Sequence, residues 1–351
     1  MKKRQTTIKD IAKQLNIAVS TVSRALKGHP KISESTREKV MALAAKLNYK
    51  PNRIALNLKN QQTGTIGVII PDIVHHFFAT VISGIEEIAY ANGYSVMFCQ
   101  SKESYERELL DMKMLVENGV DGLMISHSRE TTDFSHFQEA IDQNIPIVFF
   151  DRAPKLLNAP KVIINDFESA RLATQHLIDQ SCQNIIHLTG TMNLQISQER
   201  KRGFLSAITA NLSVGTSQSG NRLTNDELVV DCISCSKESG YSHMKEILES
   251  EHIPDGVFVN NDMMAYGVME AINEADLRIP EDIAVIGFSN WNFSSLIKPQ
   301  LSSVDQQGLE MGRTAVKILL EMINDNIKEE KGTAVLEGKL VVRTSSKKIK
   351  Q

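Results

Sequence analysis

Residues 7–58 read TIKDIAKQLNIAVSTVSRALKGHPKISESTREKVMALAAKLNYKPNRIALNL, and apolar side chains recur along this stretch at spacings of three and four. Such spacing is typical of amphipathic helices. It predicts helices over Thr7–Leu15, Val19–Leu26 and Ser33–Asn48. Only a tight turn fits between the first two, so the stretch predicts a helix-turn-helix covered by a third helix.

Charge distinguishes this stretch from the rest of the chain. Residues 1–60 contain 14 Lys and Arg residues and three acidic residues, a net charge of +11, whereas all 351 residues together carry −3. The helical pattern alone is equally consistent with an inert bundle and with a DNA-binding unit. The concentrated positive charge favours DNA, because neutralising phosphates supplies most non-specific affinity. The face of the second helix away from its apolar stripe carries Val19, Ser20, Ser23 and Arg24, as expected of a recognition helix.

From residue 65 onward the pattern changes to short, β-branched apolar runs that alternate with helical segments. Such runs are typical of strands buried on both faces. They are TIGVIIP (65–71), YSVMFCQ (94–100), DGLMIS (121–126), IPIVFFD (145–151), VIIND (162–166), NIIHLTG (184–190), GVFVNN (256–261) and DIAVIGF (282–288). The helical segments are Ala79–Asn92, Glu103–Asn118, Ser169–Asp179, Glu199–Ala210, Ser239–Leu248 and Met263–Ala275. The alternation predicts two successive lobes, each a doubly wound parallel sheet.

Three segments together carry a family resemblance: TIKDIAKQLNIAVSTVSRAL, then REKVMALAAKLNYKPNRIALNLK, then TIGVIIPDI. The sequence resembles the LacI/GalR family of bacterial transcription regulators from Thr7 nearly to its C-terminus. This resemblance implies an all-α helix-turn-helix head and an α/β body of the periplasmic-binding-protein type I fold, with three crossings between the lobes. We therefore expect a head over 1–60 with a hinge helix at about 53–59, and an effector-binding and dimerisation domain over 61–351. The expected lobes are 65–164 with 292–325, and 165–291 with 326–351.

The resemblance also implies a function: a sequence-specific regulator, most often a repressor, that binds a palindromic double-stranded DNA operator as a homodimer. Leu58 matches the family's hinge leucine, an apolar wedge that enters the minor groove and kinks the duplex. Ala18 departs from the usual Ser before the recognition helix, which costs about 1 kcal/mol of helix capping. The expected DNA contacts are Thr7, Val19, Ser20, Thr21, Ser23, Arg24, Asn52, Ala55, Leu58 and Lys59.

A small-molecule effector, a sugar or sugar derivative, is expected between the lobes, because ligands of such sheets bind outside the carboxyl ends of the strands. Arg200, Asp151 and Gln306 match family positions that contact ligands, although each polar residue could instead cap a helix or link the lobes. The family's common Asp is replaced by Ser289, and imidazoles follow the first strand, so we expect an effector unlike a neutral sugar, such as an anionic one. The expected contacts are His75, Phe77, Phe78, Ser126, Asp151, Asp166, Arg200, Asn261, Asp262, Ser289, Trp291 and Gln306.

Other classes of function have weaker support. No apolar run approaches the 18 or so residues of a membrane span, and MKKRQTTIKD lacks the apolar core of a secretion signal. We therefore expect a cytoplasmic, nucleoid-associated protein and no membrane partner, which disfavours the alternative of a transport or chemosensory receptor. No Gly-x-Ser-x-Gly, Walker or His-Glu-x-x-His motif suggests an enzyme. We expect no cofactor or metal, since Cys232 and Cys235 lack a second pair of ligands.

Overall fold

The computed structural model describes residues 6–49, 62–211, 214, 224–250, 252–325 and 332–347. The chain divides into two compact units, Met1–Gly64 and Thr65–Gln351. In the first unit, α1 (Ile8–Leu15), α2 (Val19–Leu26) and α3 (Glu34–Lys46) lie where the apolar spacing predicts. Ile11, Val22 and Val40 are fully buried and bring the three helices together in one small core.

The turn between α1 and α2 follows from its residues. Asn16 ends α1 in the left-handed conformation, with φ at 49°, which Asn tolerates better than most residues. Ala18 precedes α2 and makes no side-chain cap. Thr7 caps α1 together with Asp10, whose carboxylate accepts hydrogen bonds from the Thr7 amide and hydroxyl, both at 2.8 Å. The helix-turn-helix geometry is thus fixed locally.

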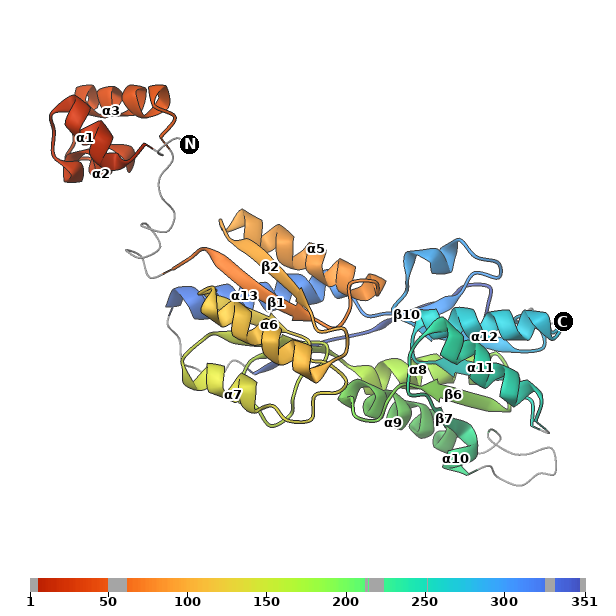
Figure 1. Cartoon of the computed structure of the whole chain (residues 1–351). Coiled ribbons are helices and arrows are strands. Elements are labelled where there is room, and N and C mark those ends of the chain that lie inside the picture. The colour runs from red at the N-terminus through yellow and green to blue at the C-terminus, as the bar shows by residue number, and fades with distance from the viewer. Residues whose placement is uncertain are drawn as a thin grey trace, which may run out of the picture. The chain divides into compact units, whose positions relative to one another are not determined.

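The second unit contains two six-stranded sheets (Figure 1). The first sheet has the order β11-β5-β4-β3-β1-β2, and all its pairings are parallel. Its strands are β1 (Thr65–Ile70), β2 (Ser95–Gln100), β3 (Gly122–Ile125), β4 (Ile147–Phe150), β5 (Lys161–Ile164) and β11 (Thr333–Leu336). The second sheet has the order β12-β10-β9-β8-β6-β7, with only β12 antiparallel to its neighbour. Its strands are β6 (Ile185–Thr189), β7 (Val229–Asp231), β8 (Gly256–Val259), β9 (Ala284–Phe288), β10 (Ser302–Asp305) and β12 (Lys339–Val341).

Helices cover both faces of each sheet, as strands buried on both faces require. On the first sheet, α5 (His76–Ala91) and α13 (Gly308–Asp325) pack on one face, while α6 (Tyr105–Glu117) and α7 (Ser135–Asp142) cover the other. On the second sheet, α8 (Asp166–Asp179) and α9 (Gln195–Ala210) lie opposite α11 (Lys237–Leu248) and α12 (Asp262–Glu274). The short elements α10 (Asn225–Leu228) and η1 (Asn292–Ser295) complete this lobe.

The positions of two lobe crossings differ from the sequence-based expectation. The chain crosses first after β5, near residue 165, as expected. It then remains with the second sheet through β10 and crosses between Asp305 and Gly308, not near 292. It crosses back between Leu336 and Lys339, because β11 pairs with β5, not near 325. We therefore define the first lobe as residues 65–164, 308–325 and 332–336, and the second lobe as 165–305 and 339–347.

Strand β10 belongs to the second sheet although its sequence is polar. Ser302 and Ser303 are fully buried, yet an apolar run is the usual signal for a buried strand. Their hydroxyls are satisfied by hydrogen bonds: Ser303 donates to Asp262 Oδ1 at 2.6 Å, and Ser302 pairs with Ser346 at 2.7 Å. Hydrogen bonds to Asp262 and Ser346, which are distant in sequence, replace apolar packing here. The sequence of β10 alone therefore does not reveal that the strand is buried.

Helices α5 and α13 touch through glycines. A Cβ on Gly312 would lie 2.1 Å from the carbonyl oxygen of Val81, and a Cβ on Gly84 would lie 2.1 Å from that of Leu309. Real Cβ atoms do not approach backbone oxygens so closely, so the helices are adjacent because these positions lack side chains. This contact attaches the last long helix to the first sheet.

Gly312→Ala is expected to lower the free energy of unfolding by about 1–3 kcal/mol through overpacking, although Ala favours helices by about 1 kcal/mol over Gly. Urea unfolding followed by circular dichroism measures the difference. Gly332→Ala is the matched control, because no atom lies within 4 Å of its added Cβ. Equal stability of the Gly312 variant and wild type would show that α5 and α13 separate at little cost.

Candidate functional site

The candidate DNA-reading surface is the outer face of α2. Val19 is 41% exposed, and Ser20 and Arg24 are exposed beside it, while Thr21 and Ser23 are half-buried. The opposite face of α2 is buried in the core of the first unit. Thr7 lies at the exposed N-terminus of α1. The predicted hinge helix and its contacts Asn52, Ala55, Leu58 and Lys59 lie outside the described residues.

The candidate ligand site is a cavity of about 260 Å³ between the two lobes of the second unit. It lies at the carboxyl ends of the strands, since its walls come from the segments that follow β1, β2, β3, β4, β6, β7, β8, β9 and β10. The lining residues are His75, Phe77, Phe78, Glu103, Arg129, Asp151, Arg152, Thr191, Leu194, Ile196, Arg200, Ile233, Ser234, Cys235, Ser236, Asn260, Asn261, Ser289 and Gln306. The volume lies close to the lower end of the range of about 300–1,000 Å³ that is typical of ligand pockets, which suits a small molecule.

The structure brings most of the predicted effector contacts together in this cavity. Those that line it are His75, Phe77, Phe78, Asp151, Arg200, Asn261, Ser289 and Gln306. Four others, Ser126, Asp166, Asp262 and Trp291, do not line it. Each of these four comes directly after a strand or soon after it, so position along the chain alone does not separate wall residues from residues that support the wall.

Arg200 lines the cavity, although it does not open its helix as the sequence suggested. Helix α9 begins at Gln195, so Arg200 lies in its second turn. Its Nε donates to Asp166 Oδ1 at 2.7 Å, its Nη1 donates to the carbonyl of Asn260 at 2.8 Å, and its Cζ lies 3.7 Å from the centre of the Phe288 ring. Asp166 therefore acts through Arg200, and its pKa is raised by burial despite this cation.

Asp262 is a buried centre of hydrogen bonds behind the cavity. It accepts from the Ser303 hydroxyl at 2.6 Å, the Trp291 amide at 2.6 Å and the Ser294 hydroxyl at 2.8 Å. Burial raises its pKa to about 6 against these donors. The Trp291 ring stacks on His76 with centroids 6.4 Å apart, so it links the lobes beside the cavity. Ser126 is fully buried at the end of β3.

Two charged residues beside Asp151 were missed by the sequence analysis. Arg152 donates to both carboxylate oxygens of Glu103, at 2.8 and 3.0 Å. Burial acts to raise the pKa of Glu103, but the Arg152 guanidinium outweighs it and the pKa lies below its usual value. Arg152 comes directly after Asp151, which was predicted from the end of its strand. The sequence signal for Arg152 was therefore its position next to a predicted contact. Glu103 follows β2, and its charge was the only sequence feature that could have indicated a place in the cavity.

Asp151 is the most exceptional group in the cavity. It is 5% exposed, adopts a left-handed φ of 58°, and its Oδ1 has no hydrogen-bond partner among the described residues. Burial raises its pKa to about 6, although the neighbouring Arg152 opposes this. A buried acceptor without a partner costs free energy, so Asp151 is suited to receive a donor from a ligand.

Comparisons with known proteins agree with this architecture. Residues 7–52 match the family model of bacterial regulatory proteins of the lacI family, and residues 174–346 match a periplasmic binding protein-like domain. The HTH-type transcriptional repressor PurR of Vibrio vulnificus (strain CMCP6) is 34% identical over 346 residues, which cover 98% of this chain and 99% of that protein. The catabolite control protein A of Priestia megaterium is 31% identical over 319 residues, covering 91% and 92%.

The chain belongs to the lacI family of bacterial regulatory proteins. It is a DNA-binding transcription regulator, as the helix-turn-helix, the basic head and the named relatives together show.

Solved structures share the fold of this lacI-family regulator. A lac repressor dimer bound to operator and the anti-inducer ONPF superposes with a TM-score of 0.84 at 27% identity, covering 98% of this chain and 99% of that one. A lacI-family regulator from Enterococcus faecium with bound ribose gives 0.69 at 30% identity, covering 82% and 100%. Within the described ranges, no helix of this regulator is long and apolar enough to cross a membrane.

The raised pKa of Asp151 predicts a pH dependence of stability. Unfolding returns this carboxyl to a pKa near 4, so the folded state binds more protons between about pH 4 and pH 6, and its stability falls as pH rises through this window. Asp151→Asn removes the buried charge and should raise the free energy of unfolding at pH 7, relative to pH 4, by up to about 3 kcal/mol. Urea titrations at pH 4, 5, 6 and 7 measure this.

The matched control for this prediction is Asp142→Asn, which removes an exposed carboxylate at the end of α7. It should leave the slope of stability against pH unchanged. Identical slopes for Asp151→Asn and wild type would show that water solvates Asp151 in the folded protein.

Proposed function

We propose that this regulator binds a palindromic operator as a homodimer, and that a small molecule in the cavity sets its operator affinity. The main observation in support is that both lobes contribute residues to the cavity walls. His75 and Arg129 come from the first lobe, whereas Arg200 and Ser236 come from the second. A ligand that contacts both walls changes the relative stability of different lobe angles.

Two observations support DNA as the target of the head. The first 60 residues carry a net charge of +11, and the outer face of α2 presents short polar side chains together with Arg24. The similar lac repressor was solved as a dimer bound to operator. Two heads on one symmetric site explain how a small domain gains specificity. The simplest version of this proposal is a cytoplasmic repressor that binds chromosomal DNA.

The first lobe also offers a surface for the second copy. Tyr90 at the end of α5 is 78% exposed, and Phe98 on the edge strand β2 is 40% exposed. Leu110 and Met114 on α6 are 66% and 41% exposed. Exposed apolar groups gathered on neighbouring elements are typical of interaction surfaces. This placement supports dimerisation through the first lobe, which joins directly to the segment that leads to the head.

Coupling between the cavity and the head follows from population shift. A ligand alters operator affinity only by its differential affinity for the two lobe arrangements, and such coupling is typically about 1–3 kcal/mol. The regulator from Enterococcus faecium was solved with ribose bound. This supports a sugar-like effector for the present cavity, whose walls combine aromatic rings with carboxylate, amide and guanidinium groups.

Arg24→Ala is expected to relax base preference at one symmetric position of the operator, because Arg can make a bidentate contact to guanine worth about 1–3 kcal/mol. Selection of binding sites from random DNA by the full-length protein measures this. Lys9→Ala and Lys31→Ala remove exposed charges elsewhere on the head and should weaken binding to all sequences alike. An unchanged preference in the Arg24 variant would exclude it from base reading.

Asp151→Ala is expected to preserve operator affinity but to raise the effector concentration needed for half-maximal response by about tenfold, the loss of one strong hydrogen bond. A thermal-shift screen identifies the effector, because a bound ligand raises the melting temperature. Fluorescence anisotropy with labelled operator then measures the response, with Asp142→Ala as control. A wild-type response from the Asp151 variant would remove the cavity from the control mechanism.

A further inference from the structure

The three arginines that line the cavity differ in how their charge is balanced. Arg152 is paired with Glu103 through two hydrogen bonds, and Arg200 is paired with Asp166. Arg129 forms no ion pair with any residue that the structure describes. Its guanidinium donates from Nη1 to the carbonyl of Ile233 at 3.3 Å, a long hydrogen bond. The acid near it, Glu103, already accepts two hydrogen bonds from Arg152. Arg129 is therefore the least balanced of the three positive charges on the cavity wall.

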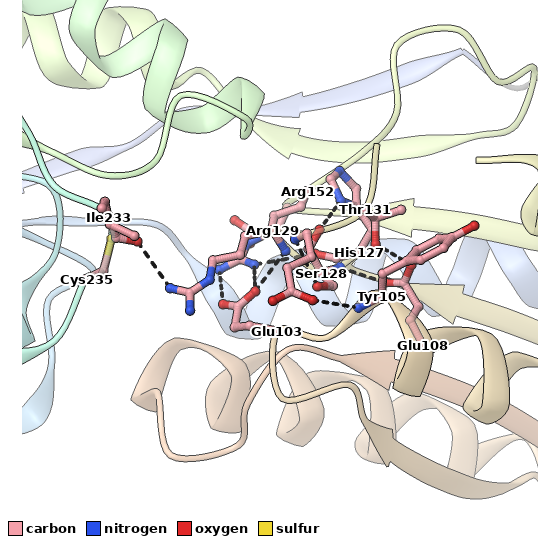
Figure 2. Close-up of polar contacts among 12 residues, drawn as sticks. Glu103, Tyr105, Glu108, His127, Ser128, Arg129, Thr131, Arg152, Ile233 and Cys235 are labelled. Carbon is pink, nitrogen blue, oxygen red and sulfur yellow. Dashed lines mark hydrogen bonds and ion pairs between the residues drawn. The ribbon is translucent and has the colours of Figure 1, made fainter. Parts of the chain in front are cut away.

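The position of Arg129 is fixed by two acidic residues (Figure 2). Glu103 accepts a hydrogen bond from the Arg129 amide at 2.9 Å while it also holds Arg152. Glu108, fully buried on α6, accepts from the Ser128 amide at 2.6 Å and from the Thr131 hydroxyl at 2.7 Å. The loop that follows β3 is thus tied down on both sides of Arg129. The backbone that carries the Arg129 side chain is therefore already ordered, which lowers the cost of binding an anion there.

Helix N-termini add to the positive potential at this wall. Ser236 and Asn261 line the cavity and are the N-caps of α11 and α12, and Leu194 lines it at the N-cap of α9. Each helix contributes a partial positive charge of about 0.5 at its N-terminus. Together with Arg129, these termini favour a negatively charged group inside the cavity.

Another part of the cavity requires hydrogen-bond donors instead. Asp151 Oδ1 and Asn260 Oδ1 are buried acceptors without partners among the described residues, in side chains 5% and 4% exposed. Hydroxyl groups on a ligand would satisfy both acceptors. The cavity therefore combines acceptors that need hydroxyl donors with a separate cation that needs an anion, in a volume of about 260 Å³.

We propose that the effector is a small polyhydroxylated molecule with one carboxylate or phosphate group, and that Arg129 binds this group. The inference rests on the proposed function of the cavity and names the class of its ligand. Arg129 belongs to the first lobe, and its contact Ile233 belongs to the second. An anion held between Arg129 and the N-terminus of α11 links the two lobes, so the group that gives specificity also affects the lobe angle.

The test compares glucose, glucose 6-phosphate, gluconate and inorganic phosphate as ligands of the full-length protein. Thermal shift and titration calorimetry are run at low and high salt. We expect glucose 6-phosphate or gluconate to bind at least about tenfold more tightly than glucose, and to weaken as salt rises. A preference between phosphate and carboxylate identifies the anionic group. Binding of phosphate alone, without the sugar ester, would contradict the requirement for hydroxyl groups.

Variants assign the effect to Arg129. Arg129→Met keeps the length of the side chain and should weaken the anionic ligand about tenfold or more, while glucose binding stays unchanged. Arg129→Lys should recover part of the affinity, because it restores the charge but not the planar fork. Arg107→Met removes one exposed positive charge from the same lobe, outside the cavity wall, and should change nothing.

Besides binding of phosphate alone, three results would overturn the inference: glucose binding as tightly as its anionic forms, no measurable binding of either anionic form, or unchanged anion affinity in Arg129→Met. Operator binding is measured in the same preparations. Retained, sequence-specific operator binding beside any of these results rejects the ligand class alone. Loss of effector control for every ligand that binds the cavity rejects the proposed function itself.

Discussion

The buried ion pair between Arg200 and Asp166 organises the second lobe around the cavity. A single guanidinium reaches from α9 to the first residue of α8, to the end of β8 through the Asn260 carbonyl, and to the end of β9 through the Phe288 ring. Removing one partner from such a pair typically costs about 3–5 kcal/mol, because the other charge stays buried. Arg200 therefore stabilises the fold as well as lining the cavity, so a substitution at Arg200 is expected to destabilise the second lobe.

The cavity lies beside the segments that join the two lobes. The three crossing segments contact one another: the Asn165 amide donates to the Leu336 carbonyl at 2.8 Å, and the Gln307 side chain donates to the Glu337 carbonyl. Gln306, in the middle segment, accepts from the Ser289 hydroxyl at 2.8 Å and lines the cavity. A ligand in the cavity would therefore contact a segment that joins the lobes, where a small shift can be amplified into a change of lobe angle.

The sequence predicted those parts of the fold that rest on apolar periodicity, and missed those that rest on partners distant in the chain. The three head helices and eight of the strands carry local patterns. Strand β10 does not, because Ser302 and Ser303 are satisfied by hydrogen bonds from elsewhere. The lining residues of the cavity divide in the same way, into those with a local sequence signal and those that depend on distant partners. Strand-end residues such as Asp151 were found from topology, whereas Arg129 depends on a loop held by Glu108, twenty residues before Ser128.

The replacement of the family's aspartate by Ser289 fits the charge balance of the cavity. Ser289 uses its hydroxyl to hold Gln306 and adds no charge. An aspartate there would add another carboxylate to the cavity wall, and its negative charge would disfavour an anionic ligand. With Ser289 in place, Asp151 is the one lining acid among the described residues without an arginine hydrogen-bonded to it, and burial already weakens its ionisation. The substitution and the unpaired arginine therefore point to the same kind of ligand, although they lie on different lobes.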